Sequence, residues 1–135
     1  GENFFRDKEN QVIKRLLHEK CCVLATGGGA FMNKKIRTSI KEQGVSVWLN
    51  ADLETLWKRV KHKRSRPLLR TDNPRETLVN IYTDRFKTYS LADIIIDSND
   101  KSSLEEMANL VIKSLLIGFL SLSLFSIVTS ALVPQ

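Results

Sequence analysis

Three consecutive glycines, Gly27, Gly28 and Gly29, follow a short apolar run and could do chemistry through their backbone. Glycine allows the backbone to approach a ligand closely or to adopt a positive φ. Successive N–H groups in such a loop can also bind an anion. A tight turn from a strand into a helix is the alternative, although one glycine normally serves for that. We therefore favour an anion-binding loop.

Arginines form a second group of candidate residues. Residues 58–70 are strongly basic, and Arg66 precedes Pro67, which restrains the backbone beside the charge. A planar guanidinium can bind phosphate oxygens through two hydrogen bonds at once. A solvated basic surface is the alternative. Nucleic-acid binding is disfavoured because the segment has neither interleaved aromatic residues nor a helix suited to enter a groove.

Arg85 and Arg6 lie among apolar residues, where a charge requires a partner. Arg85 precedes Tyr89 by four residues, so the two share one face of a predicted helix. Arg6 follows two phenylalanines. For each arginine the partner is either a carboxylate of this chain or the carboxylate of a substrate.

The elements that must position these residues alternate along the chain. Short apolar runs at 22–25, 45–49 and 92–96 predict strands, and helical patterns flank each of them. The expected helix starts are Asp7, Ala30, Asn50 or Asp52, Asn73, and a capping box at Ser102. Strands separated by helices predict a parallel sheet with right-handed crossovers. Ligands bind such sheets at the carboxyl ends of the strands, where the glycines would lie.

Composition restricts the class of protein. The 135 residues have 42% hydrophobic and 27% charged residues, which excludes wholesale disorder and is typical of about one domain. The net charge of +6 suits an anionic ligand. Cys21 and Cys22 predict two small buried side chains, and no His or Cys spacing predicts a metal site. Nothing resembles a signal peptide, so we expect a cytoplasmic protein.

Four motifs together resemble the shikimate kinase family. They are Gly1-Glu2-Asn3-Phe4-Phe5-Arg6, Thr26-Gly27-Gly28-Gly29-Ala30, Arg66-Pro67-Leu68-Leu69, and Arg85-Phe86-Lys87-Thr88-Tyr89 followed by Ala92-Asp93. Their order and spacing match from residue 1 to about residue 112. The resemblance implies an α/β fold like that of nucleoside monophosphate kinases, with a parallel sheet, flanking helices and a lid loop.

The same resemblance implies an activity and roles for particular residues. The family transfers the γ-phosphoryl group of ATP to the 3-hydroxyl of shikimate with Mg²⁺, in aromatic amino-acid biosynthesis. By position, Arg6 and Arg85 would bind the shikimate carboxylate, and the three glycines would contact its ring. Arg66 would be the catalytic lid arginine that meets the ATP phosphates. Arg59 would flank the adenine, near the loop at residues 98–100.

One family feature is missing from the sequence. The family's phosphate-binding loop, G-x-x-x-x-G-K-[ST], does not occur. We therefore expect a C-terminal portion of a shikimate kinase that lacks the first strand, the P-loop and the metal ligand, and that is inactive alone. The alternative is a non-catalytic remnant that binds shikimate or phosphate, with membrane association possible. A monomer is expected.

The last 22 residues differ from the rest, because no charge follows Lys113. We divide the chain into a kinase-like domain at 1–113 and an uncharged hydrophobic tail at 114–135. As a helix the tail would be about 33 Å long, enough for a bilayer core. A membrane anchor is one interpretation, and an out-of-frame or run-on extension that packs as an apolar helix is the favoured one. In either case we expect the tail to be dispensable for chemistry.

Overall fold

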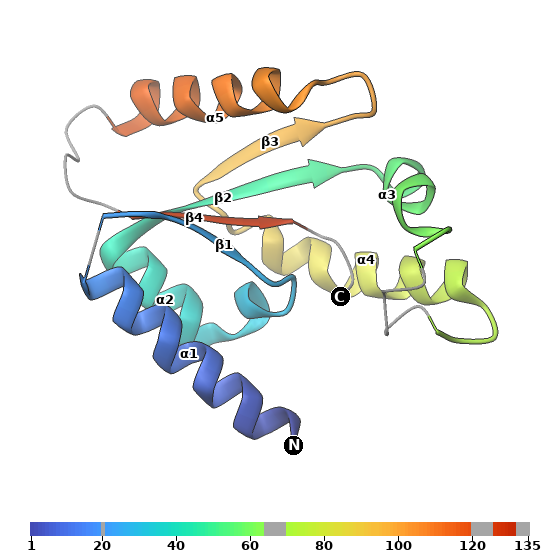
Figure 1. Cartoon of the computed structure of the whole chain (residues 1–135), viewed down its shortest axis with the longest axis horizontal. Coiled ribbons are helices and arrows are strands. Elements are labelled where there is room, and N and C mark those ends of the chain that lie inside the picture. Colours follow the sequence, from blue (N-terminus) through green and yellow to red (C-terminus); the bar gives the residue numbers. More distant parts are fainter. Residues whose placement is uncertain (20, 64–69, 120–125, 132–135) are drawn as a thin grey trace.

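Helices cover both faces of a four-stranded parallel sheet in the computed structural model (Figure 1). The structure describes residues 1–19, 21–63, 70–119 and 126–131. The elements, in chain order, are α1 (Glu2–Glu19), β1 (Val23–Thr26), the 3-10 helix η1 (Ala30–Met32), α2 (Lys34–Gln43), β2 (Gly44–Ala51), α3 (Leu53–Val60), α4 (Pro74–Tyr89), β3 (Ile94–Ser98), α5 (Leu104–Phe119) and β4 (Ser126–Ala131).

The strand order is β1-β4-β2-β3, and every neighbouring pair is parallel. Helix α5 lies on one face of the sheet, whereas α1, α2 and α4 lie on the other (Figure 1). The expected α/β class with a parallel sheet is confirmed. Because all strands are parallel, their carboxyl ends lie at one edge, together with the loop that follows β1.

Two of the expected helix starts are confirmed by hydrogen bonds. The Oδ1 atom of Asp52 accepts from the Thr55 amide at 2.8 Å, which caps α3. At α4, Asn73 Oδ1 accepts from the Glu76 amide at 3.3 Å, and Pro74 occupies the first turn. Both helices therefore begin where a short polar side chain can replace a missing backbone acceptor.

Two other helix starts were wrong. Helix α1 begins at Glu2, so Asp7 lies inside it. The Phe5 N–H already makes a helical hydrogen bond to the Gly1 carbonyl, at 3.2 Å. The last capping box is formed by Ser103 and not by Ser102. Ser103 Oγ accepts from the Glu106 amide at 3.1 Å, and Glu106 accepts from the Ser103 amide at 2.7 Å.

The two cysteines are less buried than expected. Cys21 is exposed and Cys22 is half-buried. Both precede β1, which begins at Val23 and is an edge strand of the sheet. A short apolar run on an edge strand does not have the cover of a central strand, which is why its first residues remain accessible.

An aromatic cluster forms the part of the core beneath the glycine loop. Tyr89 is 0% exposed, and its ring lies 5.6 Å from that of Phe31 and 5.7 Å from that of Trp48, in edge-on arrangements. Such arrangements suit the ring quadrupoles. The cluster joins α4, η1 and β2, so the end of α4 has a fixed position relative to the loop.

The apolar C-terminal residues do not form one continuous helix. Helix α5 extends across the expected boundary at 113/114 to Phe119, but Ser126–Ala131 form strand β4, so the helix expected there is wrong. Strand β4 lies inside the sheet, where Val128 is aligned with Leu24 of β1 and with Ser46 of β2. In the described part of the chain, no helix combines the length and hydropathy needed to cross a bilayer.

Candidate active site

The loop after β1 is held through all three of its glycine carbonyls. The Ala30 amide donates to Gly27 at 3.0 Å and the Met32 amide donates to Gly29 at 3.2 Å, while the Tyr89 hydroxyl donates to Gly28. These bonds direct the carbonyl groups toward η1 and the core. The loop is therefore tied to η1 and to α4 by its own hydrogen bonds.

Gly29 is required for a close approach and not for a positive φ. Its φ is −86°, which any residue can adopt. A Cβ atom at this position would lie only 2.6 Å from Nη2 of Arg6. A side chain here would thus displace the guanidinium, and glycine allows Arg6 of α1 to lie directly against the loop.

Arg6 has carboxylate partners within its own helix. Its Nη1 donates to Glu9 at 2.8 Å, and its Nη2 lies 3.5 Å from Glu2. The guanidinium also lies 5.2 Å from the centre of the Phe5 ring. The charge of Arg6 is therefore partly neutralised, and the guanidinium is held in place at the glycine loop.

Arg85 differs from Arg6 because its guanidinium lacks such a partner. Its Nη1 is buried and makes no hydrogen bond with the described residues, and none of the ion pairs among them includes Arg85. Burial is the main cause that lowers the pKa of Arg85 below its usual value; Tyr89 opposes this shift, and the positive charge of Arg6 adds to it. A buried cation near a second cation is expected to bind an anion.

A cavity of about 380 Å³ lies between α1 and β1 and extends to the glycine loop. Its lining includes Phe5, Glu9, Ile13, Thr26 and Gly27. The cavity is mainly apolar, with polar groups at the loop. Its charged lining residues are Lys8 and Glu9, and neither Arg6 nor Arg85 lines it, so the cavity adjoins the glycine loop without containing the two arginines.

Arg37 of α2 holds the 3-10 helix η1, which follows the glycine loop. Its Nη1 donates to the carbonyl groups of Phe31 at 2.7 Å and Met32 at 2.8 Å, at the end of η1. The sequence did not indicate Arg37 or Glu9, because their partners are a backbone turn and a neighbouring side chain. Tyr89 was noticed as part of a motif and as a companion of Arg85 on the same helix face, without a role of its own.

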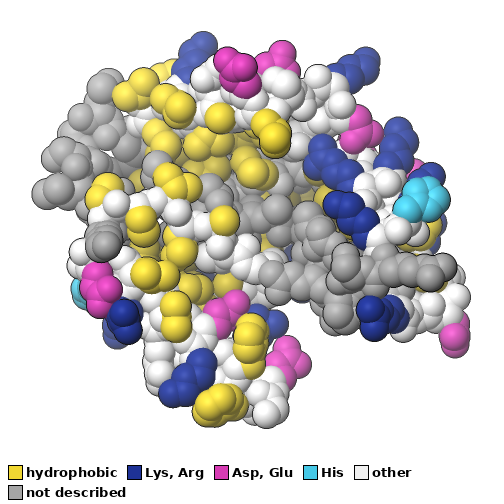
Figure 2. Space-filling model, viewed as in Figure 1, with side chains coloured by type: hydrophobic (Ala, Val, Ile, Leu, Met, Phe, Trp, Pro, Cys, Tyr) yellow, Lys and Arg dark blue, Asp and Glu magenta, His cyan; other side chains and the backbone are white. Residues whose placement is uncertain are grey.

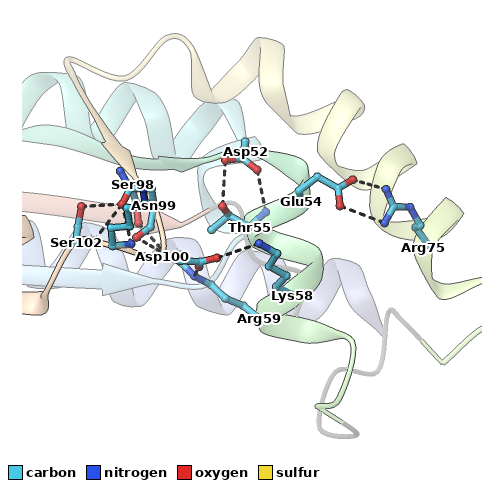
Figure 3. A network of polar contacts seen from close by, with 11 residues as sticks. Asp52, Glu54, Thr55, Lys58, Arg59, Arg75, Ser98, Asn99, Asp100 and Ser102 are labelled. Atoms are coloured by element: carbon cyan, nitrogen blue, oxygen red, sulfur yellow. Dashed lines mark hydrogen bonds and ion pairs between the residues drawn. The ribbon is translucent and has the colours of Figure 1, made fainter.

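A second polar cluster lies at the carboxyl end of β3, where Arg59 contacts residues 98–100 (Figure 3). Arg59 Nη2 donates to Ser98 Oγ and to the Asn99 carbonyl, both at 3.3 Å. Its Nε lies 3.6 Å from Asp100, and Lys58 Nζ lies 3.7 Å from the same carboxylate. Lys and Arg side chains gather over this α3 end of the molecule (Figure 2).

A family model described as "Shikimate kinase" matches residues 1–116. The chain belongs to the shikimate kinase family. It is 54% identical over 115 residues to the shikimate kinase of Ruegeria pomeroyi, and the match covers 85% of this chain and 59% of that relative. It is 56% identical over 108 residues to the shikimate kinase of Cereibacter sphaeroides, covering 80% and 54%. The chain thus spans little more than half the length of these curated relatives.

Solved shikimate kinases share the fold. The shikimate kinase from Acinetobacter baumannii, solved in complex with shikimate, is 32% identical with a TM-score of 0.72, over 87% of this chain and 64% of that chain. The shikimate kinase from Bacteroides thetaiotaomicron has the same TM-score at 21% identity, over 87% and 69%. The second likeness concerns the fold alone.

The structure brings together most of the residues that the shikimate kinase motifs indicated. Gly29 lies against Arg6, and Arg6 is near enough to Arg85 to affect its pKa. Arg59 lies apart from them, at the loop of residues 98–100. Arg66 lies outside the described residues.

The described residues form no cluster of metal-binding side chains. They contain no group of three His, Cys, Asp or Glu side chains that could hold a metal ion. Mg²⁺ in phosphoryl-transfer enzymes is held by carboxylate or hydroxyl oxygens together with substrate phosphates. The described residues therefore offer no ready-made metal cage, and Mg²⁺ would depend on substrate phosphates and on further oxygen ligands.

Proposed function

We propose that this chain provides the shikimate-binding part of an enzyme that transfers the γ-phosphoryl group of ATP to the 3-hydroxyl of shikimate. The observation that supports this most strongly is the buried Nη1 of Arg85, which has no partner among the described residues. Arg85 lies one turn before Tyr89, the last residue of α4, which contacts the glycine loop. The likeness to a shikimate kinase solved with shikimate supports the choice of anion.

In this proposal Arg6 and Arg85 bind the carboxylate of shikimate. Arg6 is already paired with Glu9, whereas Arg85 has donors to spare. Charge-assisted hydrogen bonds from two guanidinium groups would both hold the substrate and relieve the repulsion between them. The glycine loop then lies beside the ring of the substrate.

Transfer of a phosphoryl group depends on alignment and on neutralisation of charge. We assign Gly27, Gly28 and Gly29 to the contact with the ring and the nearby γ-phosphate, and Arg66 to the ATP phosphates. Arg59 is assigned to the adenine side, which agrees with its hydrogen bonds to Ser98 and Asn99. ATP is the phosphoryl donor, and Mg²⁺ would need ligands other than the described residues. A cytoplasmic, monomeric protein stays a prediction of the sequence.

The first test measures binding without chemistry. Shikimate titrated into the 135-residue chain in a calorimeter should release or absorb heat and saturate at one site per chain. Shikimate methyl ester, which lacks the carboxylate charge, should bind much more weakly. Equal binding of acid and ester, or no binding of shikimate, would overturn the assignment of Arg6 and Arg85.

The second test measures chemistry. The 135 residues contain no G-x-x-x-x-G-K-[ST] sequence, so we expect no ADP release from the chain with shikimate and Mg·ATP. A version extended upstream by the family's P-loop segment should turn over. Equal turnover by both versions would place the phosphate site within these 135 residues. Binding without turnover by the extended version would favour the non-catalytic alternative.

A further inference from the structure

We propose that Tyr89 is a positioning residue for shikimate binding, because its hydroxyl group fixes the direction in which the Gly29 amide points. The inference rests on the proposed function, since it concerns the same loop. Neither the motif match nor the charge pattern assigns this role to Tyr89.

The tyrosine ring cannot turn away from the loop. Tyr89 is fully buried, and Phe31 and Trp48 contact it edge-on from η1 and β2. The hydroxyl donates to the carbonyl oxygen of Gly28. A buried hydroxyl group needs a partner, so this bond keeps the carbonyl directed toward the core.

Planarity of the peptide group transmits this direction to the next amide. The peptide bonds of the described residues are not cis, so the C=O of Gly28 and the N–H of Gly29 point in opposite directions. The N–H of Gly29 thus points away from Tyr89 and the core. None of the hydrogen bonds among the described residues uses it, and Gly29 is the residue against which Arg6 lies.

One helix therefore sets two parts of the site at a fixed spacing. Arg85 and Tyr89 are one turn apart on α4, so the cation with the buried unpaired nitrogen and the hydroxyl that holds the loop move together. An anion bound by Arg85 and Arg6 would have the Gly29 amide beside it as a further donor.

The test compares Tyr89→Phe with Tyr82→Phe. Both remove one hydroxyl group from α4, but none of the hydrogen bonds among the described residues involves the hydroxyl of half-buried Tyr82. Shikimate Kd and the ¹H–¹⁵N signal of the Gly29 amide are measured for both and for the unaltered chain. We expect Tyr89→Phe to raise Kd about tenfold, as for one lost hydrogen bond, and Tyr82→Phe to leave it within about twofold.

The spectrum separates positioning from a general loss of stability. In the unaltered chain, shikimate should shift the Gly29 amide signal. In Tyr89→Phe that signal should already differ without ligand, and its response to shikimate should shrink, while signals of β3 stay in place. A folded Tyr89→Phe with unchanged Kd and an unchanged Gly29 signal would overturn the inference alone.

Two other outcomes are decisive. If the unaltered chain does not bind shikimate, the proposed function fails and the inference fails with it. If Tyr89→Phe does not fold, two NMR measurements on the unaltered chain test the inference instead. The Tyr89 hydroxyl proton should exchange slowly enough to be observed, and the Gly29 amide should shift at saturating shikimate. If the hydroxyl proton is not observed, or if the Gly29 amide signal does not shift, the inference is overturned.

Discussion

Arg6 and Arg85 illustrate how one residue type plays two parts at the same site. Both guanidinium groups lie at least partly under other atoms, but Arg6 is paired with Glu9 at 2.8 Å and Arg85 has a buried nitrogen with no described partner. The paired arginine has its charge largely compensated within α1. For Arg85, the free-energy cost of burying an unpaired charge would be reduced when an anionic ligand binds.

We expect Arg85→Ala to weaken shikimate binding by about 1.5–3 kcal/mol, as for a lost charged hydrogen bond. Calorimetric titration of the chain measures this directly. Arg75→Ala is the matched control, because Arg75 is also on α4 but is exposed and paired with Glu54. It should bind shikimate normally. Equal affinities of the two variants would contradict the role of Arg85.

The sequence indicated the site residues better than it indicated their supports. Arg6 and Arg85 were found as charges among apolar residues, and the glycines as three in a row. Arg6 has carboxylate partners in its own helix, Glu2 and Glu9, and its role toward a substrate stays a prediction. Arg37 and Tyr89 were not assigned roles, because both act by donating to backbone carbonyl groups. Any residue has such carbonyls, so no residue type marks the acceptor.

Helix α3 begins at a carboxylate, and this gives its stability a pH dependence. Hydrogen bonds from Thr55, first from its amide and then from its hydroxyl, hold the pKa of Asp52 below its ordinary value of 3.8. A lowered folded pKa means that the stabilisation is complete above about pH 4 and is lost as the pH falls through the lower, folded value.

Melting temperatures of Asp52→Asn and the unaltered chain, measured from about pH 6 to about pH 2, test this. Asparagine can still cap the helix but does not ionise. The unaltered chain should lose more stability than Asp52→Asn below about pH 4, so that their difference shrinks. Asp84→Asn, an exposed change on α4, should follow the unaltered chain. Parallel curves for Asp52→Asn would show that the cap carboxylate does not matter.

Helices and strands whose signals lie within a few residues, such as a capping side chain or a short apolar run, were predicted well. The caps at Asp52 and Asn73 and the strands of the first 113 residues were recovered from sequence. The Ser102 box was displaced by one residue, because Asn99 Oδ1 already accepts from the Ser102 amide at 3.1 Å. The apolar run 114–135 has no periodic signal that separates helix from strand, and the helix prediction was wrong at residues 126–131, which form β4.

At the scale of the whole molecule, β4 connects the glycine loop to the rest of the sheet. Strand β1 pairs only with β4 among the described strands, and β4 in turn pairs with β2. Without β4, the strand that leads into Gly27 would have no partner in the described sheet. This position changes the expectation that the tail is dispensable.

We expect Val128→Pro to destabilise the protein by about 1–3 kcal/mol, since proline removes a ladder donor from an interior strand and leaves an acceptor unpaired. Val128→Thr, which keeps the N–H and a β-branched side chain, should cost much less. Urea unfolding of both variants measures the difference. Shikimate affinity should fall with Val128→Pro as β1 loosens. Two variants of equal stability would mean that β4 does not contribute to the sheet.

The interior place of β4 also sets the order in which the chain can fold during synthesis. The pairing of Val23 with Ile127 joins residues near opposite ends of the printed sequence, so the sheet has a high contact order. Such non-local parallel pairing is slow, because loop-closure entropy is lost before the contacts form. Among the described strands, β1 therefore cannot gain its partner until β4, whose last residue is Ala131, has been synthesised. Until β4 forms, the edges of β1 and β2 that face it stay unpaired within the described sheet, and unpaired strand edges favour aggregation.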